Sequence, residues 1–435
     1  MKNLTIIILA AGKGTRMNSS VPKVFQSLGG IPLIEHALNS AKTLNPKEIF
    51  LILNKNISKE DFNNEKLVHC FYQKRQLGTA DAVKTCLARL KNNKNKVLVM
   101  YADHPFIESK TLKKVVNLKS SKSIKLLSFK KEEHNSYGKV ILGTDSFVKE
   151  IIEQRELNSK DRYILCNSGI FCAHAKIFSQ LLPKIKNNNK KKEFYLTDIF
   201  KIASQNNFHT EIVLGEESEI MGINDKKELA EAEKILQENL RNKFLKKGVS
   251  MKDPDTVYLS ADTKIGKDVT IYPHVFIGEN VTIASGATIY SFSHLENCKI
   301  GNKSSIGPYA RLRPGANVSD GAKVGNFVEV KNSTIGKNSK VNHLTYIGDA
   351  EIGKNVNIGA GTITCNYDGK KKHKTIIEDE VFIGSNSSII APVKIGKKSY
   401  IGSGSAISKD VKPKSLAVER SVQMEIKNWS KKVKK

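Results

Sequence analysis

Aliphatic residues return at every sixth position over most of the second half of the chain, from Ile265 to Ile407. An α-helix has an apolar period near 3.6 residues and a half-buried strand a period of 2, so neither produces this spacing. Six residues make one short strand and one corner, and three such units close a triangular coil with the aliphatic side chains pointing inward. The pattern therefore predicts a solenoid of stacked coils, in which each coil buries its apolar edge against the next.

The repeat is irregular in two ways. Three times, a run of aliphatic residues hands over to the next run one residue early, at Ile300, Ile335 and Ile352. Residues 366–374, with the sequence NYDGKKKHK, interrupt the repeat altogether. We therefore expect trimmed corners at the three handovers and a protruding loop at 366–374. Exposed edges of the coils favour oligomers or caps.

Short apolar runs alternate with helical patterns in the first half of the chain. The predicted strands cover 4–9, 48–53 and 97–101, and the predicted helices cover 32–42, 79–90 and 109–119. This alternation is typical of an α/β fold with a mostly parallel sheet.

A segment rich in Glu, Lys, Leu and Ala joins the two halves. Its apolar residues fall on one helical stripe over residues 226–247, and Gly248 ends the pattern. The sequence thus predicts an α/β domain over 1–225, a linker helix over 226–247, and a solenoid domain with an irregular tail over 248–435.

The charge of the chain raises the hypothesis of nucleic-acid binding. The formal net charge is +28, from 71 Lys and Arg against 43 Asp and Glu in 435 residues. Only nine of these basic residues are arginines, and many lysines lie in Asn/Lys stretches. Base readout relies on arginine forks, and single-strand binding relies on interleaved aromatic residues. Neither pattern is evident, so we interpret most of this charge as solvated surface and expect no nucleic-acid partner.

The cysteine pattern and the apolar runs bear on the compartment. The six cysteines form no CxxC pair, which is typical of a reduced, intracellular protein. The opening residues 1–11 resemble a signal peptide, but they continue directly into a glycine loop, which favours a buried strand. No segment approaches the roughly 18 apolar residues of a membrane span. We expect a cytoplasmic protein without membrane insertion.

A glycine loop follows the first predicted strand, in residues 9–17 (LAAGKGTRM), and Pro22 and Lys23 come shortly afterwards. Backbone N–H groups of such a loop can meet phosphate oxygens, and Arg16 and Lys23 can neutralise a triphosphate. The loop matches neither Walker A nor GxGxxG, which disfavours P-loop and Rossmann dinucleotide chemistry. The extended motif resembles that of sugar-1-phosphate nucleotidyltransferases.

Groups suited to a base and a metal follow this loop. Gln73 and residues 76–80 (QLGTA) offer an amide and backbone N–H groups to a uracil edge, and Thr79 is also expected to cap a helix. Asp103 ends a predicted strand with a carboxylate, a usual place to hold Mg²⁺ beside a polyphosphate. Because aspartate is common at strand ends, a purely structural role for Asp103 stays open.

Three segments of the solenoid depart from the simple repeat. They cover 310–315 (ARLRPG), 325–331 (GNFVEVK) and 342–349 (NHLTYIGD). Arg313 and Lys331 are 18 residues apart, so they are expected on adjacent coils, with His343 on the coil above or beside them. Two cations and an imidazole suit a sugar phosphate and a general base, although a lone histidine is more often structural.

These segments, with residues 357–369 (NIGAGTITCNYDG), closely resemble the bacterial bifunctional N-acetylglucosamine-1-phosphate uridyltransferase/glucosamine-1-phosphate N-acetyltransferase family. The resemblance runs over nearly the whole chain in the same order, and both halves carry their own motifs. It implies a Rossmann-like nucleotidyltransferase domain followed by a left-handed parallel β-helix, whose hand the period alone does not give. Members usually have glycine where Ala102 stands, which leaves Asp103 intact.

The resemblance also implies roles for residues of the first half. Arg16 and Lys23 would be catalytic in uridylyl transfer, and Asp103 and Asn224 would hold Mg²⁺. The residues expected to bind UTP and UDP-N-acetylglucosamine are Leu9, Ala10, Ala11, Gly12, Lys23, Gln73, Gly78, Thr79, Tyr101, Asp103, Gly138, Glu153, Asn167 and Asn224.

In the second half, the resemblance implies that His343 is the general base of acetyl transfer, and Glu329 is expected to orient its imidazole. The residues expected to bind glucosamine 1-phosphate are Arg313, Lys331, Tyr346 and Asn357. The residues expected to bind acetyl-CoA are Ala360, Asn366, Tyr367, Ser385, Ser403 and Arg420. A backbone amide near Ser385 or Ala360 is expected to stabilise the oxyanion.

The function implied has two steps. An acetyl group passes from acetyl-CoA to glucosamine 1-phosphate, and the product then attacks UTP to give UDP-N-acetylglucosamine, a precursor for peptidoglycan and lipopolysaccharide, with release of pyrophosphate. A homotrimer is expected from the resemblance. Two alternatives are a monofunctional sugar-1-phosphate nucleotidyltransferase with a regulatory β-helix and a basic, non-enzymatic solenoid scaffold. The motifs at His343 and at residues 366–367 argue against the first, and the glycine loop and Asp103 argue against the second.

Overall fold

The computed structural model describes residues 3–62, 65–91, 95–131, 135, 137–157 and 164–430. Two compact units make up the chain, Met1–Glu233 and Lys234–Lys435. The boundary between them falls inside the helix α7, Lys226–Leu245, which the sequence predicts over 226–247. No helix of the described residues combines the length and the apolar character that crossing a membrane requires.

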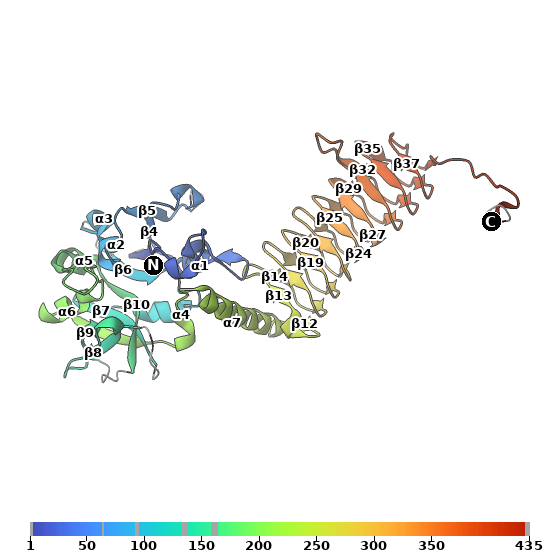
Figure 1. Cartoon of the computed structure of the whole chain (residues 1–435). Coiled ribbons are helices and arrows are strands. Elements are labelled where there is room, and N and C mark those ends of the chain that lie inside the picture. Colours follow the sequence, from blue (N-terminus) through green and yellow to red (C-terminus); the bar gives the residue numbers. More distant parts are fainter. Residues whose placement is uncertain are drawn as a thin grey trace. The chain divides into compact units, whose positions relative to one another are not determined.

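The first unit is built on one mixed sheet, with strands in the order β11-β7-β10-β6-β1-β4-β5 (Figure 1). Its strands are β1 (Leu4–Leu9), β4 (Glu48–Asn54), β5 (Val68–Gln73), β6 (Lys96–Tyr101), β7 (Ser123–Lys130), β8 (Lys139–Leu142), β9 (Val148–Ile152), β10 (Leu165–His174) and β11 (His209–Leu214). Strands β2 (Ser27–Leu28) and β3 (Ile31–Pro32) form a separate hairpin. The α-helices are α1 (Leu33–Lys42), α2 (Thr79–Lys84), α3 (Leu87–Lys91), α4 (Ser109–Val115), α5 (Ala175–Leu181) and α6 (Asp198–Gln205).

The central strand β1 is buried on both faces because helices cover the sheet from both sides. Ile6 and Ile8 pack with residues of α1 and α4 in one apolar cluster. Ile7 and Leu9 pack with residues of α2, α3, α5 and α6 in another. Successive side chains of a strand point to opposite faces, so a continuous apolar run is what a three-layer α/β sandwich needs.

The predicted α/β class is confirmed, with two local differences. Strands β1, β4, β5 and β6 pair in parallel, but β10 runs antiparallel between β6 and β7, so the sheet is mixed. The helix predicted over 79–90 is divided into α2 and α3 by a turn at residues 85–86.

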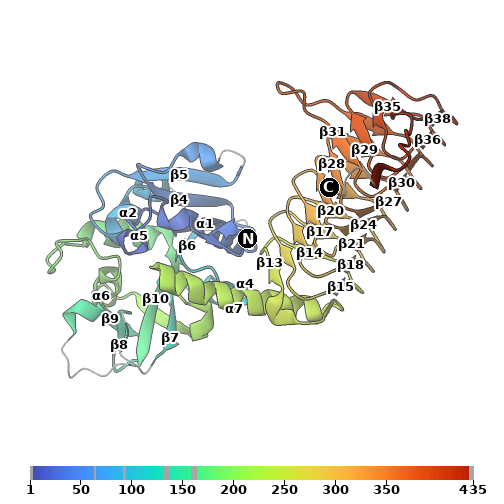
Figure 2. The same ribbon diagram turned by 45° about the vertical axis from the view of Figure 1, so that its right-hand side comes forward.

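The second unit is a parallel β-helix with three faces, which confirms the predicted solenoid (Figures 1 and 2). Face 1 contains β12 (Ser250–Met251), β15 (Thr270–Ile271), β18 (Thr288–Ile289), β21 (Ser305–Ile306), β24 (Lys323–Asn326), β27 (Lys340–His343), β30 (Asn357–Ile358), β33 (Phe382–Ile383), β36 (Tyr400–Ile401) and β38 (Leu416–Ala417). Face 2 contains β13 (Tyr258–Leu259), β16 (Phe276–Ile277), β19 (His294–Leu295), β22 (Arg311–Leu312), β25 (Glu329–Lys331), β28 (Tyr346–Gly348), β31 (Ile363–Cys365), β34 (Ser388–Ile390) and β37 (Ala406–Ile407).

Face 3 contains β14 (Lys264–Ile265), β17 (Thr282–Ile283), β20 (Lys299–Ile300), β23 (Asn317–Val318), β26 (Thr334–Ile335), β29 (Ala350–Ile352), β32 (Thr375–Ile377) and β35 (Val393–Ile395). All three faces contribute aliphatic residues to one continuous core, and Ile289, Leu312 and Ile335 are completely buried in it. The register advances by 18 residues in regular coils, as from Arg311 to Glu329, and by 17 where a corner is trimmed, as from Asn317 to Thr334.

The three corners of the coil have left-handed backbone conformations but different side chains. At the corner between faces 3 and 1 the residues are Asp268, Gly286, Lys303, Gly321, Asn338, Asn355, Glu380, Lys398 and Lys414, and between faces 2 and 3 they are Asn280, Asn297, Gly315, Asn332 and Asp349. Between faces 1 and 2 the corner of the later coils carries Gly361, Asn386 and Gly404, and that of five earlier coils carries the column His274, Phe292, Tyr309, Phe327 and Leu344, all in the same conformation. We call this last column the apolar corner.

The side chains of the apolar corner form an exposed stack. The rings of His274 and Phe292 are 5.1 Å apart, those of Phe292 and Tyr309 are 4.9 Å apart, and those of Tyr309 and Phe327 are 5.0 Å apart. The exposed fraction is 55% for Phe327 and 64% for Leu344. A left-handed conformation costs an ordinary L-residue about 1–2 kcal/mol, so bulky side chains at this corner are unusual on stability grounds alone.

Candidate active sites

The glycine loop and Asp103 meet because β1 and β6 are parallel neighbours. Leu9 at the end of β1 lies opposite Tyr101 at the end of β6, and Ala102 N–H donates to the Leu9 carbonyl at 3.1 Å. The carboxyl ends of both strands therefore open at the same edge of the sheet, which is where α/β folds place their ligands. Gly14, in the loop after β1, has a positive φ of 60°.

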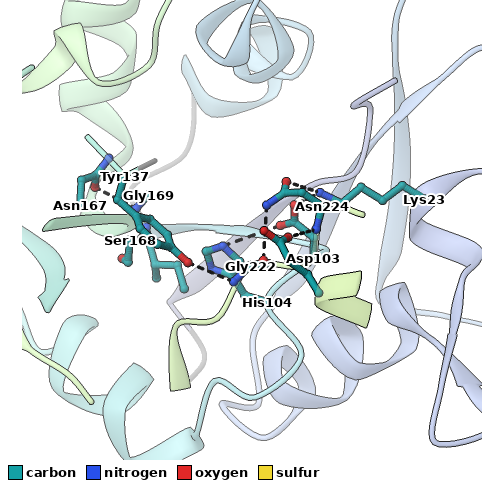
Figure 3. A network of polar contacts seen from close by, with 11 residues as sticks. Lys23, Asp103, His104, Tyr137, Asn167, Ser168, Gly169, Gly222 and Asn224 are labelled. Carbon is teal, nitrogen blue, oxygen red and sulfur yellow. Dashed lines mark hydrogen bonds and ion pairs between the residues drawn. The ribbon is translucent and has the colours of Figure 1, made fainter. Parts of the chain in front are cut away.

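The side chain of Lys23 lies between Asp103 and Asn224 (Figure 3). Its Nζ donates to Asp103 Oδ2 and, at 3.0 Å, to Asn224 Oδ1. Asn224 is held in turn, because its backbone N–H donates to Glu228 Oε2 at 2.6 Å. Ile223 N–H donates to the Asp103 carbonyl at 3.1 Å, which ties the two segments together. Three residues predicted from far-apart motifs thus converge on one point.

This cluster is electrostatically suited to a cation. Burial raises the pKa of Asp103, but Lys23 and then His104 outweigh it, so the pKa lies below its ordinary value. Asp103 Oδ1 is buried without a hydrogen-bond partner among the described residues, and His104 Nε2 lies 3.8 Å from it. Carboxylate and amide oxygens are ligands that Mg²⁺ accepts, and here they already share one positive charge. Asp103 and Asn224 therefore fit the predicted metal site.

The segment predicted to meet the base is connected to the glycine loop. Gln76 Nε2 donates to the Ala11 carbonyl at 2.7 Å, and Gln73 Nε2 donates to the Gly78 carbonyl at 3.0 Å. Gly78 has a φ of 116°, and a Cβ there would lie 2.5 Å from the Phe194 carbonyl oxygen. Only glycine fits this position without moving the backbone.

Thr79 does not cap its helix as the sequence predicts. Helix α2 begins at Thr79, so Gly78 occupies the N-cap position and no side chain caps it. The Thr79 hydroxyl instead accepts a hydrogen bond from Leu196 N–H at 2.9 Å. Phe194 N–H donates to the Leu77 carbonyl at 2.7 Å, so a second segment already fills the space where a capping turn would form.

Gly138, Glu153 and Asn167, which belong to the set predicted to bind UTP and UDP-N-acetylglucosamine, also lie together. Asn167 N–H donates to the Gly138 carbonyl at 2.8 Å, and a Cβ at Gly138 would lie 3.6 Å from Glu153 Oε2. A Cβ at Gly169 would lie 2.5 Å from the Tyr101 ring, so that glycine allows the sugar segment to approach β6. Glu153 is therefore placed with Gly138 and Asn167, although the sequence around it offers little guidance.

Arg16 stands apart from this cluster. It lies in a short 3-10 helix, Thr15–Met17, where its side chain is exposed, and it forms no ion pair with any residue that the structure describes. The side chains of Leu9, Ala10 and Ala11 are buried, while Gly12 is exposed and a Cβ there would have no heavy atom within 4 Å. Open space at Gly12 lets a phosphate approach the backbone.

In the β-helix, His343 and Asn326 lie opposite each other on face 1. The His343 Nδ1 is 2.6 Å from Asn326 Oδ1 on the neighbouring coil. The expectation that Glu329 orients His343 is wrong, because Glu329 lies on face 2 and accepts a hydrogen bond from Arg313 Nη1 at 2.7 Å. Asn326 was missed although it belongs to the GNFVEVK motif, because the motif does not show that Glu329 has already turned the corner.

The residues predicted to bind acetyl-CoA continue the column that Asn326 and His343 begin. Gly361 N–H donates to the His343 carbonyl at 3.3 Å, and Asn386 N–H donates to the Ala360 carbonyl at 2.7 Å. Gly404 N–H donates to the Ser385 carbonyl at 2.8 Å, which places Ser403 on the next coil. His343, Ala360, Ser385 and Ser403 therefore each precede the corner between faces 1 and 2 on successive coils.

Three cations gather at the far end of face 2. Arg313 N–H donates to the Val330 carbonyl at 2.9 Å, so Arg313 and Lys331 lie on adjacent coils as their spacing predicts. The ammonium of Lys372 lowers the pKa of Lys331, with a smaller effect from Arg313. Lys372 comes from the loop at 366–374 and was not predicted as a site residue. The only sequence signal for it is the KKKHK run within that loop.

Tyr346 lies on face 2 with this cluster, whereas Asn357 does not. A Cβ at Gly348 would lie 2.4 Å from the Tyr346 hydroxyl, so the ring lies along its own strand toward the cationic end. Asn357 is on face 1, in register with Lys340 and Phe382. Within one chain, the four residues predicted to bind glucosamine 1-phosphate are thus divided between two faces.

The loop at 366–374 protrudes from the β-helix as predicted, and contacts of Asn366 and Lys374 hold its two ends to the β-helix (Figure 2). Asn366 Nδ2 donates to Asp349 Oδ2 at 2.5 Å, and the Tyr367 hydroxyl donates to the Gly369 carbonyl at 2.7 Å. Tyr367 is exposed. Arg420, in the tail, donates from Nη1 to the Ser403 carbonyl at 2.9 Å, so the tail reaches the column of predicted acetyl-CoA residues within its own chain.

Comparisons with known proteins identify the two parts of the chain. Residues 6–186 match the model of the MobA-like NTP transferase domain, and residues 256–295 and 374–409 match that of the bacterial transferase hexapeptide repeats. The chain is 42% identical over 425 residues to the bifunctional protein GlmU of Wolbachia pipientis wMel, covering 97% of this chain and 98% of the relative. It is also 42% identical to GlmU of Thermodesulfovibrio yellowstonii, covering 99% of this chain and all of that protein.

The chain belongs to the GlmU family. The predicted family and the predicted fold, an α/β nucleotidyltransferase domain followed by a left-handed β-helix of hexapeptide repeats, are confirmed. The predicted function is confirmed with them. As a GlmU family member, the chain is a bifunctional enzyme that transfers an acetyl group to glucosamine 1-phosphate and a uridylyl group to the acetylated product, giving UDP-N-acetylglucosamine. Among solved structures, the T. maritima inositol-1-phosphate CTP transferase aligns at 19% identity with a TM-score of 0.41, over 52% of this chain and 90% of that chain.

Proposed function

We propose that the two reactions of this enzyme are carried by the two clusters described above, one in each unit. Uridylyl transfer takes place at the edge of the sheet where Lys23, Asp103 and Asn224 meet. The observation that supports this assignment is the single cation, Lys23 Nζ, that Asp103 and Asn224 already share. Acetyl transfer takes place at the corner of the β-helix that carries His343.

In uridylyl transfer, the backbone of the glycine loop and Lys23 hold the triphosphate, and Gln73 and Gly78 face the uracil. Gly138, Glu153 and Asn167 hold the N-acetylglucosamine 1-phosphate, whose phosphate oxygen attacks the α-phosphorus of UTP while pyrophosphate leaves. Positioning and charge stabilisation do most of the work in phosphoryl-type transfers, so fixed cations at this edge matter more than a general base. Arg16, which is exposed and without an ion pair among the described residues, is available to the outgoing pyrophosphate.

Asp103 and Asn224 would hold Mg²⁺ for this reaction. When bound, the ion supplies Lewis-acid stabilisation of the charge that spreads over the phosphate oxygens. The rest of the site is provided by the chain itself: Glu228 fixes Asn224, and the hydrogen bond from Ile223 N–H fixes Asp103.

In acetyl transfer, His343 acts through Nε2. Asn326 Oδ1 accepts a hydrogen bond from Nδ1–H, which leaves the lone pair on Nε2 to take a proton from the 2-amino group of the sugar. The freed amine then attacks the thioester carbonyl of acetyl-CoA, and the thiolate of CoA leaves. The column Ala360, Ser385 and Ser403 continues from His343 along the corner, where it would bind the acetyl-CoA.

Glucosamine 1-phosphate would lie along face 2. Its phosphate meets Arg313, Lys331 and Lys372 at one end of the face, and its amino group points toward His343 at the other end, with Tyr346 between them. A face of about four residues spans roughly 13 Å. The long side chains at both ends shorten this gap to the size of a hexose phosphate.

A homotrimer would explain two features that a single chain leaves unexplained. The apolar corner exposes a stack of aromatic side chains in a backbone conformation that the other corners give to Asn, Asp, Glu, Gly or Lys. Asn357 lies on a different face from Tyr346 and Lys331. A neighbouring β-helix packed beside the apolar corner would bury the stack and bring a second face to the sugar.

A cytoplasmic location is consistent with the cysteines. All six are free, and four of them, Cys86, Cys166, Cys172 and Cys298, are buried. Free, buried cysteines without disulfide bonds are typical of proteins in a reducing compartment.

The assignment of the two sites is tested with glucosamine 1-phosphate, acetyl-CoA, UTP and MgCl₂ supplied together. Free CoA thiol reports the first reaction, and pyrophosphate reports the second. H343A should abolish CoA release but still release pyrophosphate when N-acetylglucosamine 1-phosphate is supplied, and D103A should do the opposite. Full acetyl transfer by H343A, or full uridylyl transfer by D103A, would overturn the assignment of that site.

A further inference from the structure

Lys23 occupies the position in which a metal ion would contact Asp103 and Asn224. Its Nζ donates to Asp103 Oδ2 and Asn224 Oδ1, which belong to the two residues that the proposed function assigns to Mg²⁺ (Figure 3). The Lys23 side chain is only 11% exposed, so this is a packed position and not a passing surface contact. A metal ion bound to these two residues would stand beside the ammonium group, and repulsion between the two positive charges sets them in competition.

The two oxygens are held in place from behind. Glu228 accepts a hydrogen bond from the backbone of Asn224 at 2.6 Å, and the Asp103 carbonyl accepts one from Ile223 at 3.1 Å. The segments carrying Asp103 and Asn224 are therefore fixed to each other. Lys23 differs from both, because rotation about the bonds of its long side chain can change the position of its ammonium group without moving the backbone.

The stem of Lys23 rests on the glycine loop. A Cβ added to Gly14 would lie 2.6 Å from Lys23 Cβ, so the loop and the lysine are in close contact. Rotation about the side-chain bonds moves Nζ between Asp103 and the loop whose N–H groups would hold the phosphates. The same lysine can therefore pair with the Asp103 carboxylate when the site is empty and with the triphosphate when UTP is bound.

The burial of Asp103 couples these two positions. Its Oδ1 is buried without a hydrogen-bond partner among the described residues, and Lys23 is the cation that contacts its Oδ2. If Lys23 left with nothing to replace it, a buried carboxylate would stay without a compensating charge, which is strongly unfavourable. Departure of Lys23 and arrival of another cation must therefore occur together.

We propose that Lys23 is the resident counter-ion of the metal site and keeps free divalent cations out until a triphosphate offers its ammonium group new anionic partners. This inference rests on the proposed function, because it takes Asp103 and Asn224 as the metal ligands. Its consequence is that metal and UTP load the site together, while a metal without nucleotide binds weakly.

The experiment measures Mn²⁺ binding to the full chain without nucleotide, by electron paramagnetic resonance of the free ion. K23M removes the competing charge, and K23Q removes it while keeping a polar group of similar length. Both variants should bind Mn²⁺ at least tenfold more tightly than the wild-type chain. K13Q, which changes an exposed lysine of the same loop, should bind as the wild-type chain does, and circular dichroism melting confirms that each variant is folded.

The outcomes separate this inference from the assignment of the site. If K23M and K23Q bind Mn²⁺ no more tightly than the wild-type chain, Lys23 is not a competitor and the inference fails. The double variant K23M/D103N should lose the gain. If it retains tight binding, the metal site does not include Asp103, and the proposed function itself is wrong at that residue.

Discussion

The Nδ1 atom of His343 lies 2.6 Å from Oδ1 of Asn326, across two neighbouring coils of the β-helix. A side-chain amide oxygen can only accept a hydrogen bond, so this pairing places the imidazole proton on Nδ1 and leaves Nε2 unprotonated. A carboxylate in the same place would also attract a second proton to the ring. A neutral amide selects the tautomer of the general base without bringing a charge to it.

Replacing Asn326 should therefore impair acetyl transfer through His343. N326A removes the acceptor, so the ring can rotate and adopt the wrong tautomer. We expect kcat for acetyl transfer to fall roughly tenfold to a hundredfold, less than the loss of about 10²–10⁴ that general-base catalysis supplies. The measurement is CoA release at saturating glucosamine 1-phosphate and acetyl-CoA.

The control for this prediction is E329Q. Glu329 pairs with Arg313 and not with His343, so E329Q should raise KM for glucosamine 1-phosphate while changing kcat little. If E329Q lowered kcat as much as N326A, the orientation of the imidazole would have to be explained differently. Uridylyl transfer by both variants should match that of the wild-type enzyme.

A second prediction concerns Lys372 and pH. The ammonium of Lys372, followed by that of Arg313, lowers the pKa of Lys331, so Lys331 loses its proton at a lower pH than an isolated lysine does. Affinity for the sugar phosphate should then weaken as pH rises through that lowered pKa. K372A should raise KM for glucosamine 1-phosphate roughly tenfold at neutral pH, because one charge-assisted hydrogen bond is lost.

K372A should also move the loss of affinity for the sugar phosphate to higher pH, because removal of the Lys372 ammonium lets the pKa of Lys331 return toward its ordinary value. KM for glucosamine 1-phosphate measured between pH 7 and 10 tests both effects. K371A, from the same loop, is the matched control and should leave the profile in place. An unshifted profile in K372A would show that Lys331 is not the group that titrates.

The six-residue repeat explains why part of the β-helix site could be predicted. Because the coil has a fixed length, an 18-residue spacing was enough to place Arg313 beside Lys331. Each trimmed corner shortens its coil by one residue, so Asn326 pairs with a residue 17 positions later. Glu329 precedes His343 by only 14 residues and lies on another face, which the motif alone does not reveal.

Other parts of the site are set by contacts that no local pattern encodes. The loop carrying Lys372 interrupts the repeat, so the six-residue period does not predict where Lys372 lies. In the first unit, Lys23 meets partners 80 and 201 residues away, and the strand order that brings them together depends on the whole sheet. The sequence could indicate which residues serve the site, but not that Lys23 stands between Asp103 and Asn224.

A third prediction compares two glycines of the phosphate loop. A Cβ at Gly12 would have no heavy atom within 4 Å, whereas at Gly14 it would lie 2.6 Å from Lys23 Cβ in a backbone with φ of 60°. G14A should lower the free energy of unfolding of the first unit by about 1–3 kcal/mol, through strain and this clash. G12A should leave that free energy within about 0.5 kcal/mol of the wild-type value.

The functional consequence of these two variants differs from their effect on stability. G12A places a methyl group where the structure leaves space for phosphate, so KM for UTP should rise at least tenfold in a fully folded enzyme. Urea unfolding and pyrophosphate release, measured on the same samples, separate the two effects. Wild-type KM for UTP in G12A would mean that the triphosphate does not lie against this part of the loop.

The last prediction concerns the apolar corner. Phe327 adopts a left-handed backbone that costs about 1–2 kcal/mol in an ordinary residue, and it regains about 0.5–1.5 kcal/mol by stacking on Tyr309. F327N removes the stacking energy and also relieves the backbone strain, because asparagine tolerates this conformation. The isolated β-helix should therefore keep its stability, while any assembly that buries the corner loses an aromatic contact.

Light scattering coupled to size-exclusion chromatography should show a trimer for the wild-type chain and smaller species for F327N, more clearly for Y309N/F327N. Acetyl transfer should fall with the trimer, whereas uridylyl transfer should be unchanged because its residues lie in the other unit. N355G, at the corner between faces 3 and 1, is the matched control and should leave the assembly intact. A trimeric double variant would show that copies of the chain meet through another surface, and the strained aromatic stack would then need a different partner.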